Sequence, residues 1–378
     1  MSSGNRAEHA RRDMTLLSLY VHIPFCHRRC PYCSFYHERH SRDGEKAFVD
    51  AVVDEARRTL DSIPGVARLD TVYFGGGTPS VLAESSWSRI LKIVDEYVTE
   101  TEKTEFTCEL NPEDVSEELL DDISVAGVNR ISLGIQSMDE VAQKVLARCP
   151  PEANRRAAKL VKDRFSNVSF DILLGVPNRR IGSLVSTLDE LLASPPAHFS
   201  VYCLEPGGDV GERVERFFDA VDAGRSAEEY LLVCDRLETA GYRHYEVSNF
   251  ALPCKESRHN RVYWEGGDYV GLGPGAHSYL FGKRFSNPPS LELYLARAGG
   301  QLEVGRVYDN ATPAELEVER VMLGLRTDRG VAVKSLHCPD GEISAILKGG
   351  LGVVHEGRLR LTARGFLVLN EVVLRVAR

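Results

Sequence analysis

The sequence predicts an α/β fold of parallel β-α units that form a partial (β/α) barrel, followed by a smaller α+β region. The first observation is an alternation of short β-branched runs with amphipathic helical segments over residues 15–240. The second is that six such strands can be counted, and right-handed crossovers would curl them into a barrel or partial barrel. The third is that the alternation stops after residue 240, where Gly, Pro, Tyr and His accumulate through residue 290.

The expected elements follow from hydrophobic periodicity. The first predicted helix places Phe48, Val52, Ala56 and Leu60 on one face. The predicted strands cover 17–23, 71–74, 105–110, 130–135, 168–174 and 199–204. The predicted helices cover 45–63, 84–98, a short segment from about 116, 138–147, 152–164, 183–193 and 227–240.

The second half is less regular. We expect a helix over 314–325, and the tail alternates weakly around 359–361 and 367–376. The predicted organisation is therefore a disordered N-terminus (1–14), a barrel domain (15–240) and a C-terminal domain (241–378).

Composition and charge exclude several classes of protein. The 378 residues are 43% hydrophobic and 27% charged, as is usual for a globular protein. The net charge of −9 argues against broad, salt-driven binding of nucleic acid. No apolar run approaches the ~18 residues of a membrane span. The apolar stretch 16–25 resembles a signal peptide, but His22 and Pro24 interrupt it and no small-residue cleavage site follows, so we expect a cytoplasmic location.

Three of the nine cysteines crowd into one segment. Cys26, Cys30 and Cys33 have the spacing CxxxCxxC, whereas the other six are scattered singly. This pattern favours a metal or redox site in a reducing compartment over a disulfide framework. Three thiolates from one loop can ligate three irons of a [4Fe–4S] cluster and leave the fourth iron open. A zinc site is the alternative, with a histidine at 22, 27 or 37 as its fourth ligand.

Other unusual residues fall where predicted strands end. Gly75–Gly77 follow the second strand, Glu109 ends the third and Gln136 follows the fourth. Reactive groups of (β/α) barrels gather at these carboxyl ends. Glycines there allow close approach of a ligand to the backbone, although a plain tight turn would also use them.

The thiol spacing, with an aromatic residue before the last cysteine, resembles the signature of the radical S-adenosylmethionine (SAM) superfamily. The resemblance implies a [4Fe–4S] cluster whose open iron binds SAM, reductive cleavage of SAM to a 5′-deoxyadenosyl radical, and an electron donor. It implies that Cys26, Cys30 and Cys33 ligate the cluster. It also implies SAM contacts from Tyr20, Tyr32, Gly76, Gly77, Thr78, Glu109, Gln136, Arg148 and Asp171.

Longer segments resemble the HemN/HemW group of that superfamily, over about residues 17–370. These segments are RISLGIQS (130–137), FDILLGVP (170–177), HNRVYW (259–264) and GLGPGAHS (271–278). The HNxxYW motif implies a heme site, and imidazole and aromatic rings suit heme iron and the porphyrin face. The implied heme residues are His259, Asn260, Tyr263 and Trp264. Two alternatives stay open: His259 and Trp264 pack a domain interface, or His244 or His277 is the iron ligand.

Departures from the group's patterns separate its functions. HemN-type oxidases have a further cysteine where this chain has Phe35, and they have a long extension before the cluster. Both differences favour a HemW-type heme chaperone that delivers heme, as cargo, to apo-hemoproteins such as respiratory enzymes, with a homodimer as a possibility. The alternatives are an oxygen-independent coproporphyrinogen III oxidase and a HemN-like C-methyltransferase. Ser34, Cys149 and Cys203 replace the group's usual residues on the substrate side.

Overall fold

The computed structural model describes residues 14–64, 66–98, 103–204, 217, 221–298 and 305–377. The segment 1–14, predicted to be disordered, lies outside these residues except for Met14, which begins the first strand. None of the helices in the described ranges is both long and apolar enough to cross a bilayer.

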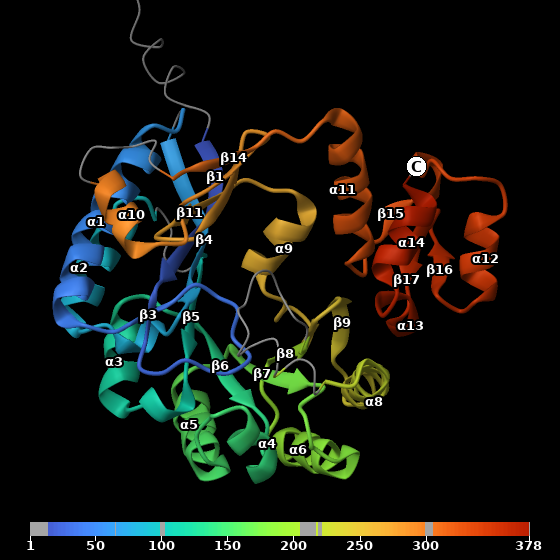
Figure 1. The fold of residues 1–378 in the computed structure, drawn as a ribbon, viewed down its shortest axis with the longest axis horizontal. Helices are drawn as coiled ribbons and strands as arrows, with labels where there is room; N and C mark the ends of the chain where they lie inside the picture. The colour runs from blue at the N-terminus through green and yellow to red at the C-terminus, as the bar shows by residue number, and fades with distance from the viewer. Residues whose placement is uncertain are drawn as a thin grey trace, which may run out of the picture.

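Six parallel strands form the centre of the molecule, as the sequence predicts (Figure 1). Each strand pairs in parallel with the next one in the series. The strands are β1 (Met14–Ile23), β4 (Val66–Gly76), β5 (Glu105–Leu110), β6 (Arg130–Gln136), β7 (Val168–Leu174) and β8 (His198–Cys203). The arrangement confirms the predicted partial (β/α) barrel.

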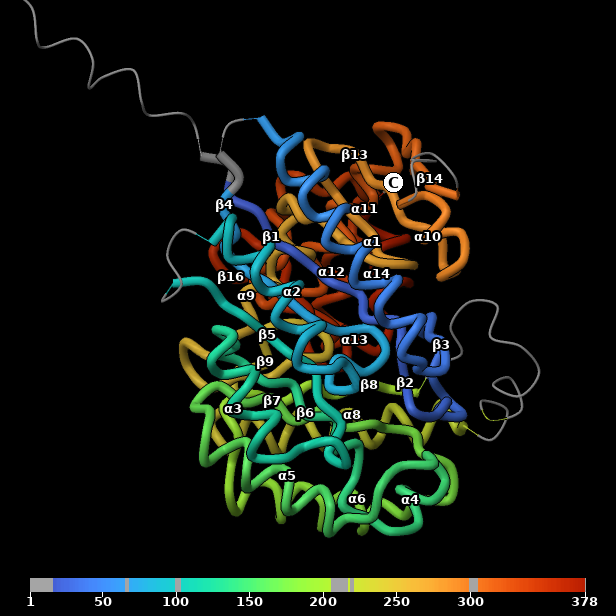
Figure 2. Tube along the Cα trace, turned by 90° about the vertical axis from the view of Figure 1, so that its left-hand side faces the viewer, coloured from blue at the N-terminus to red at the C-terminus, as the bar shows by residue number. Residues whose placement is uncertain are grey.

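The helices between the strands cover the outside of this sheet. Figure 2 shows α1 and α2 side by side, and α10 packs against α1. The helices are α1 (Arg42–Asp61), α2 (Glu84–Asp95), α3 (Glu117–Val125), α4 (Glu140–Val145), α5 (Pro151–Arg164), α6 (Ile181–Ala193), α8 (Ala223–Thr239) and α10 (Leu291–Ala298). Short connecting elements are β2 (Phe25–Cys26), β3 (Glu38–Arg39) and the 3₁₀ turns η1 (Pro79–Val81) and η2 (Pro112–Asp114).

Alternation along β1 divides the core from the barrel interior. Leu17, Leu19 and Val21 are at most 1% exposed and belong to the apolar cluster that includes the inner face of α1. The intervening side chains, such as those of Ser18 and His22, are polar and hydrogen-bond to neighbours inside the barrel. The period of two along a strand thus places the polar groups where a ligand can enter.

The sheet continues beyond the predicted boundary at residue 240. β11 (Tyr269–Leu272) pairs in parallel with β1. Next to it lie β12 (His277–Leu280), β13 (Lys283–Ser286) and β14 (Val307–Asp309), which are antiparallel. At the other edge, β10 (Asn249–Ala251) and β9 (Arg243–Glu246) follow β8. Twelve strands therefore share one sheet, and residues on both sides of position 240 contribute to it.

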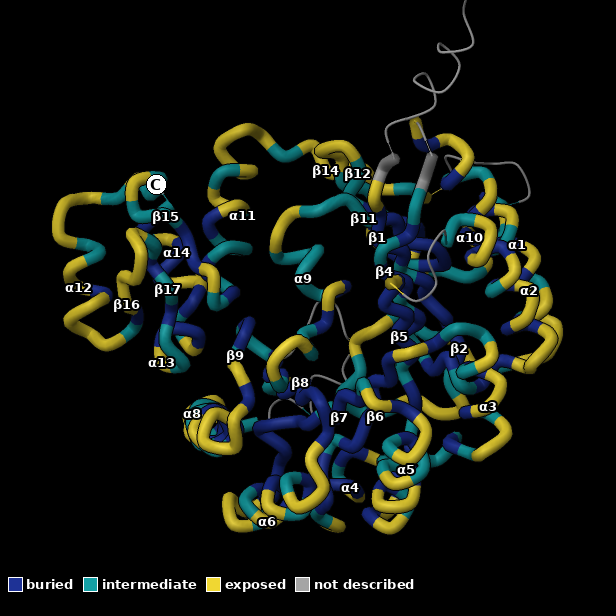
Figure 3. Tube along the Cα trace, turned by 180° about the vertical axis from the view of Figure 1, so that it is seen from behind, coloured by how far each residue is buried: buried dark blue, intermediate teal, exposed yellow. Residues whose placement is uncertain are grey.

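A smaller unit follows, with its own antiparallel sheet in the order β15-β17-β16. Figures 1 and 3 show it beside the barrel, with α9 (Arg258–Glu265) and α11 (Pro313–Leu325) between the two. Its other elements are β15 (Val331–Ala332), η3 (Val333–Ser335), α12 (Glu342–Lys348), β16 (Gly352–His355), β17 (Arg358–Leu361), α13 (Ala363–Phe366) and α14 (Leu369–Val376).

One local prediction is wrong. The tail around 367–376, which we expected to alternate weakly, is the helix α14. Its buried side chains, Leu369, Val372, Val373 and Val376, recur at helical spacing and cover one face. The expected helix 314–325 is confirmed as α11.

Candidate functional site

The three clustered cysteines lie on the loop that follows β1, and all three line one cavity of about 640 Å³. This volume falls within the roughly 300–1,000 Å³ of small-molecule sites. Eight of the nine residues predicted to contact SAM also line it: Tyr32, Gly76, Gly77, Thr78, Glu109, Gln136, Arg148 and Asp171. We call this the thiol cavity. The ninth residue, Tyr20, lines a different cavity instead.

The glycine segment after β4 holds the cysteine loop in place. Gly77 donates its N–H to the Ile23 carbonyl at 2.8 Å, and Thr78 donates its own to the Phe25 carbonyl at 2.8 Å. A Cβ at position 77 would lie 2.6 Å from the Phe25 oxygen, so only glycine fits. Gly76 has φ +102°, a conformation that other residues rarely adopt. The Thr78 hydroxyl also donates to Cys26 Sγ at 3.4 Å.

Arg148 brings a half-buried positive charge to the same loop. Its guanidinium donates to Asn111 Oδ1 at 2.7 Å and to the Gly134 carbonyl at 3.0 Å, and it lies 3.8 Å from Cys30 Sγ. A cation at this distance favours a thiolate, which is the form that ligates iron. Burial opposes this effect, because it raises the pKa of Cys26 and raises that of Cys33 to about 11. Metal binding at these thiols must therefore release protons.

Gln136 gives the wall of the thiol cavity an unpaired hydrogen-bond acceptor. Its φ of 64° lies in the left-handed region, although it is not glycine. Its Oε1 is buried and has no hydrogen-bond partner among the described residues. Strain and an unpaired acceptor at one residue are typical of a ligand contact.

Two half-buried carboxyl groups line the cavity. Glu109 accepts from the Tyr73 hydroxyl at 2.7 Å, and Asp171 accepts from the Ser132 hydroxyl at 2.9 Å. Burial raises the pKa of Glu109 to about 7 and that of Asp171 to about 6. A ligand with positively charged groups would favour the ionised form of both. Three thiols, an unpaired amide oxygen and two carboxyl groups therefore fit a [4Fe–4S] cluster with SAM, whose amino and sulfonium groups are cationic.

The three histidines weighed as zinc ligands differ in position. His27 and His37 line the thiol cavity, whereas His22 lies outside it with both ring nitrogens engaged. His22 has one ring nitrogen 3.0 Å from the Tyr20 hydroxyl and the other 2.9 Å from the Tyr36 carbonyl. His37 bonds through Nδ1 to the Phe35 carbonyl at 2.8 Å. Of the unusual cysteines, Cys203 lines the thiol cavity, whereas Cys149 is buried and donates to an asparagine side chain.

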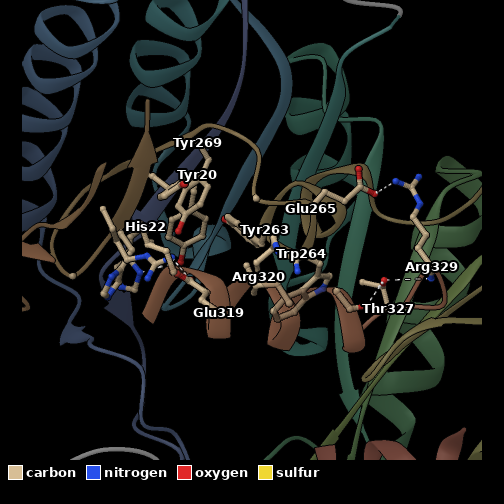
Figure 4. Close-up of a pocket in the computed structure, with 18 of the residues that line it drawn as sticks. Tyr20, His22, Tyr263, Trp264, Glu265, Tyr269, Glu319, Arg320, Thr327 and Arg329 are labelled. Atoms are coloured by element: carbon tan, nitrogen blue, oxygen red, sulfur yellow. Dashed lines mark hydrogen bonds and ion pairs between the residues drawn. The ribbon is translucent and has the colours of Figure 1, made fainter. Parts of the chain in front are cut away.

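A second cavity of about 1280 Å³ lies beside the first and is larger than most small-molecule sites. We call it the large cavity. In Figure 4, Tyr20, Tyr263 and Tyr269 lie together on one side of Trp264, and the Glu265–Arg329 ion pair lies on the other. Ser34 and Phe35, directly after the last cluster cysteine, line both cavities.

The structure divides the residues predicted to bind heme. Tyr263 and Trp264 line the large cavity, but His259 and Asn260 do not. His259 is 1% exposed, and its two ring nitrogens lie 2.7 Å from the hydroxyls of Thr71 and Tyr263. The His259 ring therefore lies between β4 and the rest of α9, away from the lining of the large cavity.

The sequence reasoning missed other residues of the large cavity. From the barrel come Tyr269, Tyr279 and Arg284, and from the smaller unit Arg329 and Arg358. No local motif marks them, because they are brought together by strand pairing and by the packing of the C-terminal unit. The position of Phe35, two residues after Cys33, could have predicted that it lies at the site.

Comparisons with known proteins agree with this geometry. The family model described as the radical SAM superfamily matches residues 20–191. The "Heme chaperone HemW" of Lactococcus lactis is 31% identical over 370 residues, which cover 94% of this chain and 96% of that protein. The protein of the same name from Mycobacterium tuberculosis is 35% identical and covers 94% of this chain and 93% of its own length. The Bos taurus "Radical S-adenosyl methionine domain-containing protein 1, mitochondrial" is 33% identical over 90% of this chain and 74% of its own.

A solved structure extends the likeness to the fold. The Escherichia coli coproporphyrinogen III oxidase HemN superposes with a TM-score of 0.80 at 22% identity and covers 97% of this chain and 91% of its own. That likeness supports the fold alone, whereas the sequence relatives cover nearly the whole chain. The chain therefore belongs to the HemW family of the radical SAM superfamily.

Proposed function

We propose that this protein is a heme chaperone, which holds heme in the large cavity and a [4Fe–4S] cluster with SAM in the thiol cavity. The observation that carries the proposal is the large cavity itself. It has room for a macrocycle, and aromatic rings from α9, β11 and β12 line it. Tyr and Trp side chains stack on flat conjugated rings and keep a polar edge for solvent.

The charge of the lining supports an anionic, flat cargo. Four arginines face two glutamates in the large cavity, an excess of two positive charges when histidine is neutral. Heme carries two propionate groups, which guanidinium groups bind well. Arg358 donates to the carbonyls of Arg329 and Gly330 at 2.7 and 2.6 Å and is in no ion pair with a carboxylate among the described residues. It is therefore available to a propionate.

In the thiol cavity, Cys26, Cys30 and Cys33 would ligate the cluster. When bound, the cluster supplies the electron that cleaves SAM. Arg148 supports the thiolates, and the Gly76–Thr78 segment brings backbone groups within reach of the ligand. Glu109 and Asp171 would hold cationic groups. An electron donor is required as a partner, and a reducing cytoplasm fits nine cysteines that form no disulfide in the structure.

The proposed partners at the other site are heme and apo-hemoproteins that receive it. Ser34 and Phe35 would stand between heme and the cluster, since both residues line both cavities. Phe35 is 66% exposed, so its apolar ring can contact a ligand in either cavity. A chaperone needs such an open site, because it must release its cargo.

An anaerobic hemin titration of cluster-reconstituted protein tests the proposal. Wild type should bind a single heme per chain in a saturable manner, and Trp264→Ala should weaken binding several-fold. Phe281→Ala is the matched control, because Phe281 is an exposed aromatic residue that lines neither cavity. Equal, non-saturating binding in all three proteins would overturn the proposal. So would SAM-dependent formation of protoporphyrinogen IX without saturable heme binding, which would identify an oxidase.

The delivery step needs its own measurement. Heme-loaded protein should activate a heme-free b-type respiratory enzyme faster than free hemin at the same concentration. Cys26→Ala, Cys30→Ala and Cys33→Ala should each abolish the broad absorbance near ~400 nm that thiolate-ligated iron produces. Full retention of that absorbance in all three variants would contradict the assignment of the cluster ligands.

A further inference from the structure

We propose that His277, outside the HNxxYW motif, is the axial ligand of the heme iron in the large cavity. This inference rests on the proposed function and adds the residue that would bind the metal. It starts from the chemistry of imidazole, because a ring nitrogen ligates iron only when its lone pair is free. Whether a histidine near the large cavity can ligate iron therefore depends on what its ring nitrogens already bind and on whether its ring reaches the cavity.

The hydrogen bonds of His259 settle its tautomer. The Thr71 hydroxyl donates its one proton to Ser18 Oγ at 2.7 Å, so it must accept from His259 Nδ1–H. The other nitrogen, Nε2, then accepts from the Tyr263 hydroxyl at 2.7 Å. The lone pair of Nε2 is therefore occupied by the hydrogen bond from Tyr263. His259 also lies outside the cavity lining and is almost fully buried, so iron cannot reach it in this arrangement.

Two other candidates also fail, one because both its ring nitrogens are engaged and the other because it lies away from the cavity. His22 lines the large cavity, but it donates to the Tyr36 carbonyl and accepts from the Tyr20 hydroxyl. His244 does not line the cavity, and its ring stacks on Phe250 with centroids 4.1 Å apart. Neither offers a lone pair to a metal in the cavity.

His277 meets each requirement. It lines the large cavity, it is exposed, and its ring has no hydrogen-bond or ion-pair partner among the described residues. It lies at the start of β12, and Tyr279, two residues along the strand, lines the same cavity. On the neighbouring strand β11, Tyr269 pairs with Tyr279 and also faces the cavity. An imidazole thus stands at the edge of an aromatic wall.

The electrostatics of this wall suit a neutral ligand. Arg284 lies over the Tyr279 ring, 5.6 Å from its centroid, and is paired with Asp309 and Glu319. Partial desolvation of the ring by its surroundings, aided by the charge of Arg284, lowers the pKa of His277, which favours the neutral form that ligates iron. The motif residue His259 would then act as a positioning residue, which holds Tyr263 at the cavity.

The test is a spectroscopic heme titration of full-length, cluster-reconstituted protein. His277→Ala should weaken hemin binding by at least about 10-fold, the lower end of the loss seen when partners of a metal site are removed. It should also remove the magnetic circular dichroism signature of histidine-ligated ferric heme, and added imidazole should restore that signature. His277→Cys should replace it with the signature of thiolate ligation. His355→Ala, at an exposed histidine of β16 outside the cavity, is the matched control and should match wild type.

The outcomes separate the two proposals. If wild type shows no saturable heme binding, the proposed function fails. If wild type binds heme and His277→Ala and His277→Cys keep its affinity and spectrum, the proposed function stands and the assignment of His277 is overturned. A loss of the histidine signature in His259→Ala but not in His277→Ala, with circular dichroism showing both variants folded, would place the ligand in the motif instead.

Discussion

Glu105 in β5 fixes the start of α9, and its removal should be costly. The side chain is 6% exposed and accepts from the backbone N–H groups of Arg258 and His259, each at 3.0 Å, and from the Ser257 hydroxyl at 3.4 Å. A hydrogen bond to a charged acceptor contributes about 1.5–3 kcal/mol. Two such bonds and the loss of a carboxylate at a helix N-terminus predict that Glu105→Ala lowers the free energy of unfolding by about 3–5 kcal/mol. Glu105→Gln keeps one acceptor and should lose about 2 kcal/mol.

The chain offers a matched control in Asp70→Asn. Asp70 pairs with the side chain of Arg258 on the same helix, but this pair is partly solvent-exposed. Its loss should change the unfolding free energy by less than about 1 kcal/mol. Urea unfolding followed by circular dichroism measures all three variants, and hemin titration of Glu105→Gln should show weaker binding because α9 carries Tyr263 and Trp264. A Glu105→Ala cost no larger than that of Asp70→Asn would refute this account of how α9 is held.

Three further predictions concern the thiol cavity. Because burial raises the pKa of Glu109 to about 7 from an ordinary 4.5, the wild-type fold loses stability as pH rises between these values. Glu109→Gln has no carboxyl group and should escape this loss. Urea unfolding at about pH 4.5 and about pH 8 should therefore show that the unfolding free energy of the variant, relative to wild type, is about 3 kcal/mol higher at the higher pH. The same free-energy difference between variant and wild type at both pH values would contradict this prediction. Gly77→Ala should abolish SAM binding in equilibrium dialysis, because its Cβ would meet the Phe25 carbonyl, whereas Gly182→Ala, in open space on α6, should be neutral or stabilising by about 0.5–1 kcal/mol in urea unfolding. Arg148→Gln should lower the iron content retained after reconstitution, measured by colorimetric iron assay, and wild-type content would argue against its role beside the thiols.

The barrel was predictable because short β-branched runs alternate regularly with amphipathic helical segments along the first two thirds of the chain. The predicted bounds 105–110 and 168–174 coincide with β5 and β7. The outer strands β11 to β13 were not predictable. Each is four residues long, which is too short to show a clear period, and β11 pairs with a strand that is distant in the sequence. The prediction for the tail was wrong because Leu367 and Leu369, two residues apart at the start of α14, have the spacing of a strand.

The two cavities differ in how much the sequence could predict. The thiol cavity is built from short motifs at strand ends, so eight of the nine residues named for SAM meet there. The large cavity draws residues from the barrel, α9 and the C-terminal unit, and no motif spans that distance. The HNxxYW spacing was informative in another way. Residues four apart share a helix face, which is why His259 reaches the Tyr263 hydroxyl rather than the cavity.

Tyr73 on β4 ties the two cavities together. Its hydroxyl donates to Glu109 in the thiol cavity, and its ring lies 5.1 Å, centroid to centroid, from that of His259. His259 in turn holds Tyr263, which lines the large cavity. A chain of direct contacts therefore runs from a carboxyl group at the proposed SAM site to an aromatic ring at the proposed heme site. Because close-packed side chains move together, we expect a change in the charge or occupancy of Glu109 to reach α9 through Tyr73.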